Sequence, residues 1–279
     1  MKRKNVLALT LVLLLIFTTV FASACGKKET AKDNDIIIGV SPSPHADIVK
    51  QVVDDLEKEG IKVTIKEYSE YVQPNLDLAE GEIDANFFQH TPYLEEFIAE
   101  RDLDLSVLGG IHIEPMGIFS TTLTSLDELK DGDEVMIPND TTNCGRALLL
   151  LQEQGLIKLG VEGVNATEKD ITENPKNLKF TALEAAAIPT VYGDAAIAVI
   201  NGNYAIQHEL NPVEDSLAIE DANSPYVNII AVRSDEAGAE KFQKLLSALQ
   251  TDKVKDFIEE TYSGSVVPAF SDADGNKVG

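Results

Sequence analysis

The chain has 279 residues, with 23 Lys and Arg against 47 Asp and Glu, which gives a formal net charge of −24 at pH 7. So acidic a chain argues against a nucleic-acid or anionic-lipid binding face, because either would need a stripe of basic side chains. The hydrophobic fraction of 44% and the charged fraction of 25% are typical of a globular protein. The length suits one large domain or two domains of roughly 100 to 150 residues each.

The N-terminus has the pattern of an export signal. Three basic residues precede an uncharged apolar run over 6–21, and the small residues ASA separate this run from Cys25. A run of 16 residues is short for a membrane-spanning helix, which needs about 20, so we expect a signal peptide over 1–24. The ending resembles a bacterial lipobox with Ala22 in place of the usual Leu, which predicts a lipid on Cys25. The alternative is a plain secretory signal with a chance cysteine.

Polar segments follow this signal and close the chain. Residues 25–35 contain the cysteine and a stretch with one Ala as its only apolar side chain, which predicts a flexible tether. Residues 271–279 are polar apart from one Ala and one Val, which predicts a flexible tail. Cys25 and Cys144 lie in such different contexts that we predict no disulfide between them.

Between these ends, short β-branched runs alternate with segments of helical period, which favours an α/β fold with largely parallel sheets. In chain order we predict a strand over 36–40, a helix over 46–59, strands over 62–68 and 83–88, a helix over 91–102, strands over 116–120 and 134–138, a helix over 145–154, strands over 178–183, 195–200 and 227–232, and helices over 235–250 and 252–261. Polar joints near 120–124 and 221–225 suggest that the chain leaves one lobe and returns to it. Two crossovers of this kind place a cleft between two lobes.

The stretch over 139–151, NDTTNCGRALLLL, follows a strand and opens an apolar helix. Free N–H groups at a helix N-terminus attract anions, and the planar fork of Arg146 suits a carboxylate, so this stretch predicts a site for a small carboxylate ligand. The alternative is that Arg146 pairs with an Asp or Glu of this acidic protein.

Aromatic and amide side chains stand at the ends of other strands. Because side chains alternate along a strand, we expect Phe87 to face the core and Phe88 to face the cleft, beside His90. Asn201 ends one predicted strand and Asn228 lies in or beside another, where a buried amide needs polar partners that a ligand can supply. The alternative for each Asn is a turn or a strand edge.

A metal site and an enzymatic site are the less favoured interpretations. His45, His90 and His112, with Glu114, Asp47 and Asp140, are types of metal ligand, but no histidine-rich loop is present and a strand through 112–114 offers two ligands on one face at most. The chain has no G-x-S-x-G, H-E-x-x-H, P-loop or G-x-G-x-x-G motif. Cys144 stands near a helix N-terminus without a base that the sequence can identify. We therefore predict no metal, no cofactor and no enzymatic activity.

A series of motifs runs along about 36–270: PHADIV, YVQPNLDLAEGEIDANFFQHTPYLE, EPMGIFS, SLDELKDGDEVMIPND, TNCGRALLLLQEQGLIKL, ENPKNLKF, AVINGNYA and SPYVN. Together, in this order and spacing, they resemble the methionine-binding lipoproteins of ABC importers, the MetQ/NlpA-type substrate-binding proteins. The resemblance implies a two-lobed periplasmic-binding-protein fold with two crossovers and an interlobe cleft. It places residues 36–120 and 228–270 in lobe 1 and residues 121–227 in lobe 2.

The resemblance also implies the roles of particular residues. Arg146, in the TN-x-GR motif, matches the residue that holds the ligand carboxylate, and the other matching positions are Asn201 and Asn228 for the polar groups, Tyr71, Phe88 and His90 for the thioether side chain, and Asn143, Glu114 and Tyr93 as weaker matches. The implied function is that of a monomeric, lipid-anchored protein on the extracytoplasmic face of a bacterial cell membrane. It binds methionine, in its L- and also its D-form, and delivers it to an ABC permease and ATPase. Another apolar amino acid or a methionine-containing dipeptide stays open as the ligand, and a metal-binding lipoprotein or an adhesin stays open as a less favoured function.

Overall fold

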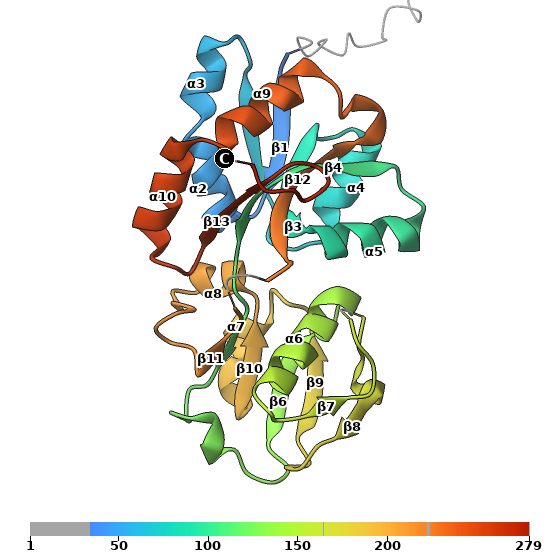
Figure 1. The fold of residues 1–279 in the computed structure, drawn as a ribbon, viewed down its shortest axis with the longest axis vertical. Coiled ribbons are helices and arrows are strands. Elements are labelled where there is room, and N and C mark those ends of the chain that lie inside the picture. The colour runs from blue at the N-terminus through green and yellow to red at the C-terminus, as the bar shows by residue number, and fades with distance from the viewer. Residues whose placement is uncertain (1–33, 164, 222–223, 279) are drawn as a thin grey trace, which may run out of the picture. The chain divides into compact units, whose positions relative to one another are not determined.

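Two β-sheets and the helices that cover them account for most of the chain from Asp35 onward (Figure 1). The structure is a computed structural model that describes residues 34–163, 165–221 and 224–278. The predicted signal peptide, Cys25 and nearly all of the predicted tether lie outside the described residues. Within these residues no helix is both long and apolar enough to span a bilayer.

The first sheet has six strands, in the spatial order β13-β4-β12-β3-β1-β2. β1 pairs in parallel with β2 and β3, whereas β12 runs antiparallel to both β3 and β4. Its strands are β1 (Ile36–Val40), β2 (Val63–Glu67), β3 (Ala85–His90), β4 (Leu105–Ile113), β12 (Val227–Arg233) and β13 (Val267–Ser271).

Helices cover both faces of this sheet, which is why its central strands β3 and β12 are buried along nearly their whole length. One face packs on the π-helical turn η2 (Pro42–Ala46) and on α2 (Asp47–Lys50), α3 (Val53–Lys58), α9 (Glu240–Leu249) and α10 (Asp252–Tyr262). The other face packs on α4 (Gln73–Glu80) and α5 (Thr91–Arg101), through Leu78 and Leu94. A 3₁₀ turn over Ser234–Glu236 precedes α9.

The second sheet has five strands, in the order β11-β5-β10-β6-β9. Its strands are β5 (Gly117–Phe119), β6 (Glu134–Pro138), β9 (Lys179–Leu183), β10 (Ile197–Ile200) and β11 (Ala218–Ile219). α6 (Thr141–Glu153) packs on one face, and α7 (Ile188–Val191) and α8 (Gly202–Gln207) pack on the other. Smaller elements are the hairpin of β7 (Lys158–Leu159) and β8 (Ile171–Glu173) and the 3₁₀ turns Leu126–Glu128, Glu168–Asp170 and Tyr192–Asp194.

The chain passes between the two sheets twice, once between β4 and β5 and once between β11 and β12. This gives the predicted two-lobed α/β fold with two crossovers. The first boundary is corrected, because β5 pairs with β10 and β11 of the second sheet. The chain therefore crosses at 114–116, and not near 120–124. The Ser/Thr-rich stretch after β5 is instead a loop, in which Ser120 accepts hydrogen bonds from the N–H groups of Thr122 and Leu123.

Two other predictions need correction. The predicted helix over 46–59 is interrupted, because Gln51 and Val52 donate their N–H groups to carbonyls three residues back and tighten the turn between α2 and α3. The apolar period continues through this break and could not reveal it. The predicted tail is also ordered over 271–278: Ser271 ends β13 and pairs with Lys277, and the N–H of Val278 donates to the carbonyl of Phe270 at 3.1 Å.

Candidate ligand-binding site

A cavity with an empty volume of about 310 Å³ contains all eight residues that the sequence predicted as a binding site. The lining residues are Tyr71, Phe88, Gln89, His90, Tyr93, Glu114, Asn143, Arg146, Asn201, Gly202, Asn203 and Asn228. Sequence reasoning did not single out Gln89, Gly202 or Asn203.

Both sheets contribute to the cavity, mainly at the ends of strands. β3 and β12 of the first sheet bring Phe88, His90 and Asn228, and the segment after β10 of the second sheet brings Asn201 and Asn203. α6 adds Asn143 and Arg146, and Glu114 stands on the first crossover between the sheets. Ligands of open α/β sheets bind at such strand ends.

Arg146 lines the cavity and pairs with an acidic residue, so the alternative interpretation of it is confirmed, while its role toward a ligand carboxylate stays a prediction. Its Nε donates to Oε1 of Glu220 at 3.0 Å, and its Nη2 donates to the same carboxylate and, at 2.9 Å, to the carbonyl oxygen of Glu114. The guanidinium carbon lies 4.2 Å from the centre of the Tyr226 ring. The hydrogen bonds that Arg146 donates to the described residues use Nε and Nη2. The position of the guanidinium is thus fixed while Nη1 stays available.

The N-terminus of α6 is not the open anion site that the sequence suggested. The helix begins at Thr141, and the Asp140 side chain caps it by accepting the N–H of Asn143 at 3.0 Å. A carboxylate of the protein itself therefore occupies the N–H of Asn143 in the first turn. The anion-binding capacity of this region lies in Arg146.

Two amide groups in the cavity each keep one atom without a partner among the described residues. Asn201 donates its Nδ2 to Oδ1 of Asn143 at 2.8 Å, while its Oδ1 is buried and unpaired. Asn203 accepts the Tyr71 hydroxyl on its Oδ1 at 2.6 Å, while its Nδ2 is buried and unpaired. Buried polar atoms are nearly always paired in native proteins. Two residues that line the cavity thus hold one acceptor and one donor without a partner among the described residues.

Asn143 and His90 line the cavity and are hydrogen-bonded to each other and to neighbouring residues. Oδ1 of Asn143 lies 3.2 Å from Nε2 of His90 and also accepts from Asn201, and its Nδ2 donates to Asp140. Nδ1 of His90 accepts the N–H of Tyr93, so the ring proton is on Nε2. Burial and the positive charge of Arg146 lower the pKa of His90 to about 3, which keeps the imidazole neutral at physiological pH.

One side of the cavity is aromatic. The Tyr71 ring centre lies 5.7 Å from that of Phe88 and 5.8 Å from that of Tyr93. Phe88 lines the cavity whereas Phe87 is fully buried in the core of the first sheet, as strand alternation predicted. This side of the cavity suits an apolar or thioether group.

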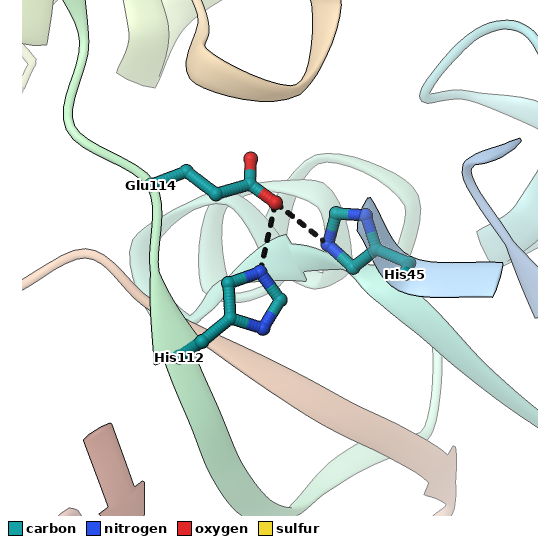
Figure 2. A group of neighbouring side chains, drawn as sticks. All are labelled: His45, His112 and Glu114. Atoms are coloured by element: carbon teal, nitrogen blue, oxygen red, sulfur yellow. Dashed lines mark hydrogen bonds and ion pairs between the residues drawn. The ribbon is translucent and has the colours of Figure 1, made fainter. Parts of the chain in front are cut away.

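His45, His112 and Glu114 form a buried cluster beside the cavity (Figure 2). Nε2 of His112 lies 2.8 Å and Nε2 of His45 lies 3.3 Å from Oε1 of Glu114. His112 and Glu114 share a face of their segment, as expected, but the third residue comes from η2, which the sequence could not place. Of the other residues considered as metal ligands, His90 and Asp140 have the roles described above, and Asp47 bonds to Lys50.

The fold does not activate the Cys144 thiol. Its thiol is partly buried, and burial raises its pKa to about 11. A thiol that stays protonated at physiological pH does not attack a substrate.

The buried histidines predict sensitivity to acid. Burial lowers the pKa of His45 to about 4 and that of His112 to about 3, from an ordinary value of about 6.5. Both pKa values are lower in the folded protein than in the unfolded chain. The two neutral histidines therefore contribute fully to the stability of the fold above about pH 6.5, and this contribution is lost as the pH falls toward 3 to 4.

We expect the melting temperature to fall across this pH range and His112→Gln to reduce the fall, as measured by thermal unfolding. His208→Gln is the matched control, because His208 is exposed. A wild-type melting temperature that stays constant from pH 7 to pH 4 would contradict this prediction.

The fold and the cavity define a class of protein. A two-lobed α/β molecule with a small, charged and partly aromatic cavity between its sheets has the construction of a periplasmic-type substrate-binding protein. The chain belongs to the NlpA lipoprotein family, whose model matches residues 36–270. The resemblance that the sequence motifs carried is thereby confirmed.

The chain is similar in sequence to named relatives, and in sequence and structure to a solved protein. The chain is 43% identical over 266 residues to the methionine-binding lipoprotein MetQ of Bacillus subtilis (strain 168), covering 92% of this chain and 96% of that protein. It is 44% identical over 256 residues to the D-methionine-binding lipoprotein MetQ of Salmonella typhimurium, covering 89% and 93% of the two chains. The structure of a nutrient binding protein from Burkholderia cenocepacia bound to methionine matches with a TM-score of 0.80 and 44% identity, over 84% of this chain and all of that one.

Proposed function

We propose that this protein is a monomeric, lipid-anchored receptor on the extracytoplasmic face of a bacterial cell membrane. It binds methionine between its two lobes and delivers it to an ABC permease and ATPase. The observation that carries the proposal is that one cavity combines an arginine, a carboxylate, an unpaired amide donor, an unpaired amide acceptor and an aromatic side. The methionine named in the relatives' descriptions supports the choice of ligand.

The carboxylate of the ligand binds to Arg146 and Asn203 in this proposal. Nη1 of Arg146 supplies a charged donor, and Nδ2 of Asn203 is the buried donor that lacks a partner among the described residues. A hydrogen bond to a charged group contributes about 1.5 to 3 kcal/mol. Both donors are held in place before the ligand arrives, which reduces the entropy lost on binding.

The α-ammonium group binds to Asn201 and Glu114. Oδ1 of Asn201 is a buried acceptor without a partner among the described residues, and Glu114 lines the same cavity. Glu114 adds the negative charge that an ammonium group requires. An α-amino acid, which has one negative and one positive group on adjacent carbons, matches these two sets of residues.

The thioether side chain lies against Tyr71, Phe88 and Tyr93. Burial of a Met side chain contributes about 1.5 to 3 kcal/mol, and sulfur–aromatic contacts add about 0.3 to 1.5 kcal/mol. Together with several charged hydrogen bonds, these terms offset the lost freedom of the ligand and reach a micromolar to nanomolar Kd, about −8 to −12 kcal/mol.

Binding also favours the closed arrangement of the lobes. The cavity residues come from both sheets, so a ligand contacts both lobes only when the lobes are together. A ligand that binds one conformation more tightly shifts the population toward it. The closed, loaded form is then the form that the permease recognises, and no covalent chemistry takes place.

Asn203→Ala tests the role of a residue that only the structure identifies. We expect it to weaken L-methionine binding about 10-fold in calorimetry, the loss of one hydrogen bond to a charged group of about 1.4 kcal/mol. Tyr71→Phe is the control, because it removes the hydroxyl that bonds Asn203 and keeps the aromatic ring. Equal losses in the two variants would show that Asn203 acts only by holding Tyr71.

A further inference from the structure

We propose that His45 and His112 are positioning residues that hold the Glu114 carboxylate in place to receive the α-ammonium group of the ligand, so that the cavity selects molecules with a free amino group. The inference rests on the proposed function and extends it beyond the residues that line the cavity. Neither histidine lines the cavity. The names of the similar proteins assign no role to either of them.

The first argument is the free-energy cost of burying the two imidazole rings. Both histidines are fully buried, and Nδ1 of each has no partner among the described residues. A buried polar atom without a partner destabilises the folded protein, and an apolar side chain of similar size would avoid this cost. What the histidines contribute must therefore come from their Nε2 atoms.

The second argument is where the Nε2 atoms point. His112 Nε2 lies 2.8 Å from Oε1 of Glu114, and His45 Nε2 lies 2.9 Å from Oδ1 of Asn228 and 3.3 Å from the same Glu114 oxygen (Figure 2). Because Nδ1 of each ring has no partner among the described residues, the ring proton belongs on Nε2. His112 donates this proton to Glu114, and His45 donates it to Asn228 while its Nε2–H stays beside the same Glu114 oxygen. The depressed pKa of both histidines agrees with a neutral ring.

The third argument is that the rings are held rigidly. The ring centre of Phe87 lies 4.6 Å from that of His45 and 5.2 Å from that of His112, edge to face in both cases. The core phenylalanine of β3 thus fixes both imidazoles, and they in turn fix Glu114.

The consequence concerns the charge of Glu114. Burial raises the pKa of this carboxyl group, whereas N–H donors and nearby positive charge favour its ionised form. Oε1 faces the two histidines, and Oε2 accepts the N–H of Asn203 at 3.2 Å. A carboxylate accepts about four hydrogen bonds, so room remains for an ammonium group. The titratable and charged groups around Glu114 are His45, His112, Arg146, Tyr71 and Tyr262.

A metal ion explains the cluster less well. The three ligand atoms lie within 4.8 Å of one another, which a metal ion would require. Histidines that bind a metal almost always donate their second ring nitrogen to a carboxylate, carbonyl or water, and here both Nδ1 atoms lack such a partner among the described residues. Hydrogen bonds alone satisfy the Nε2 atoms.

The experiment compares L-methionine with its des-amino analogue, 4-(methylthio)butanoate, by calorimetry. The readout is the ratio of the two dissociation constants, which isolates recognition of the amino group. For the wild type we expect methionine to bind at least 100-fold more tightly, and for Glu114→Gln we expect the ratio to fall at least 10-fold. His112→Leu removes the Nε2 donor, and His112→Gln is the matched control, because the Gln amide supplies an N–H at a similar distance from the backbone.

We expect His112→Leu to lower the ratio about 3- to 10-fold and His112→Gln to keep it near the wild-type value. In His112→Leu the ratio should also fall further between pH 8 and pH 6, because Glu114 with fewer donors takes up a proton more readily. Equal ratios in the Leu and Gln variants, or a ratio in the Leu variant that equals the wild-type ratio, would overturn the inference. Loss of methionine binding on treatment with EDTA and its return with Zn²⁺ would overturn it in favour of a metal site. A wild-type protein that binds no methionine at all would instead contradict the proposed function.

Discussion

Arg146→Ala is expected to weaken L-methionine binding at least 100-fold, which corresponds to about 2.7 kcal/mol. The substitution removes the positive charge that the ligand carboxylate faces. It also takes from the partly buried Glu220 its ion-pair partner, which bonds it through Nε and Nη2. Arg146→Lys should lose most of the same affinity, since a single ammonium group cannot bond Glu220, the Glu114 carbonyl and a ligand carboxylate in one plane. Calorimetry measures both losses.

The control for this prediction separates binding from stability. Glu220→Gln keeps Arg146 and the volume of the side chain, so we expect a loss of less than 10-fold for methionine. The melting temperatures of the ligand-free variants show whether each is folded. An Arg146→Ala protein that is folded and binds L-methionine with the affinity of the wild type would refute the role of Arg146.

Phe88→Ala is expected to weaken binding of L-methionine about 10- to 100-fold and to have much less effect on L-serine. The aromatic ring provides apolar contact for the thioether side chain, whose burial contributes about 1.5 to 3 kcal/mol. The ratio of methionine to serine affinity is therefore the quantity to measure. A variant with an unchanged ratio would count against a side-chain pocket at Phe88.

The adjacent Phe87 supplies the matched control. Its side chain is fully buried in the first sheet's core and does not line the cavity. Phe87→Leu should lower the melting temperature, because shortening a core side chain leaves unfilled space. It should change the ratio of methionine to serine affinity far less than Phe88→Ala does.

Arg146 also connects the cavity to both segments that join the two sheets. It donates to the carbonyl of Glu114 on the first crossover, and its partner Glu220 follows β11 at the start of the second. Oε2 of Glu220 accepts the N–H of Met116 as well, at 3.3 Å. Through these bonds Arg146 contacts both segments that join the two sheets.

The sequence predicted most strands because their β-branched runs are long and bounded by polar residues. It missed β4, whose Gly109 and Gly110 lack β propensity. A side chain at Gly109 would meet the carbonyl oxygen of Ser271 at 2.8 Å, so a glycine is required there by the approach of β13, which is remote in sequence. The same pairing orders the polar C-terminal segment. Tertiary contacts of this kind leave no local pattern.

Some features of the candidate site could also be predicted from the sequence, and others could not. Phe88, Asn201 and Asn228 could be predicted, because each stands at a strand end or inside a strand where its residue type needs an explanation. The partnership of Arg146 with Glu220 spans 74 positions, and that of His45 with Asn228 spans 183. The hydrogen bond of Asn203 with the Tyr71 hydroxyl spans 132 positions. These features follow only from the folded chain.

Calorimetric titration of the purified protein, without the predicted signal peptide over 1–24, with L-methionine tests the central claim most directly. We predict one binding site per chain with a Kd in the micromolar to nanomolar range, and native mass spectrometry of the same sample should show one bound methionine. No heat of binding and no bound mass with L-methionine, D-methionine or a methionine-containing dipeptide would contradict the account.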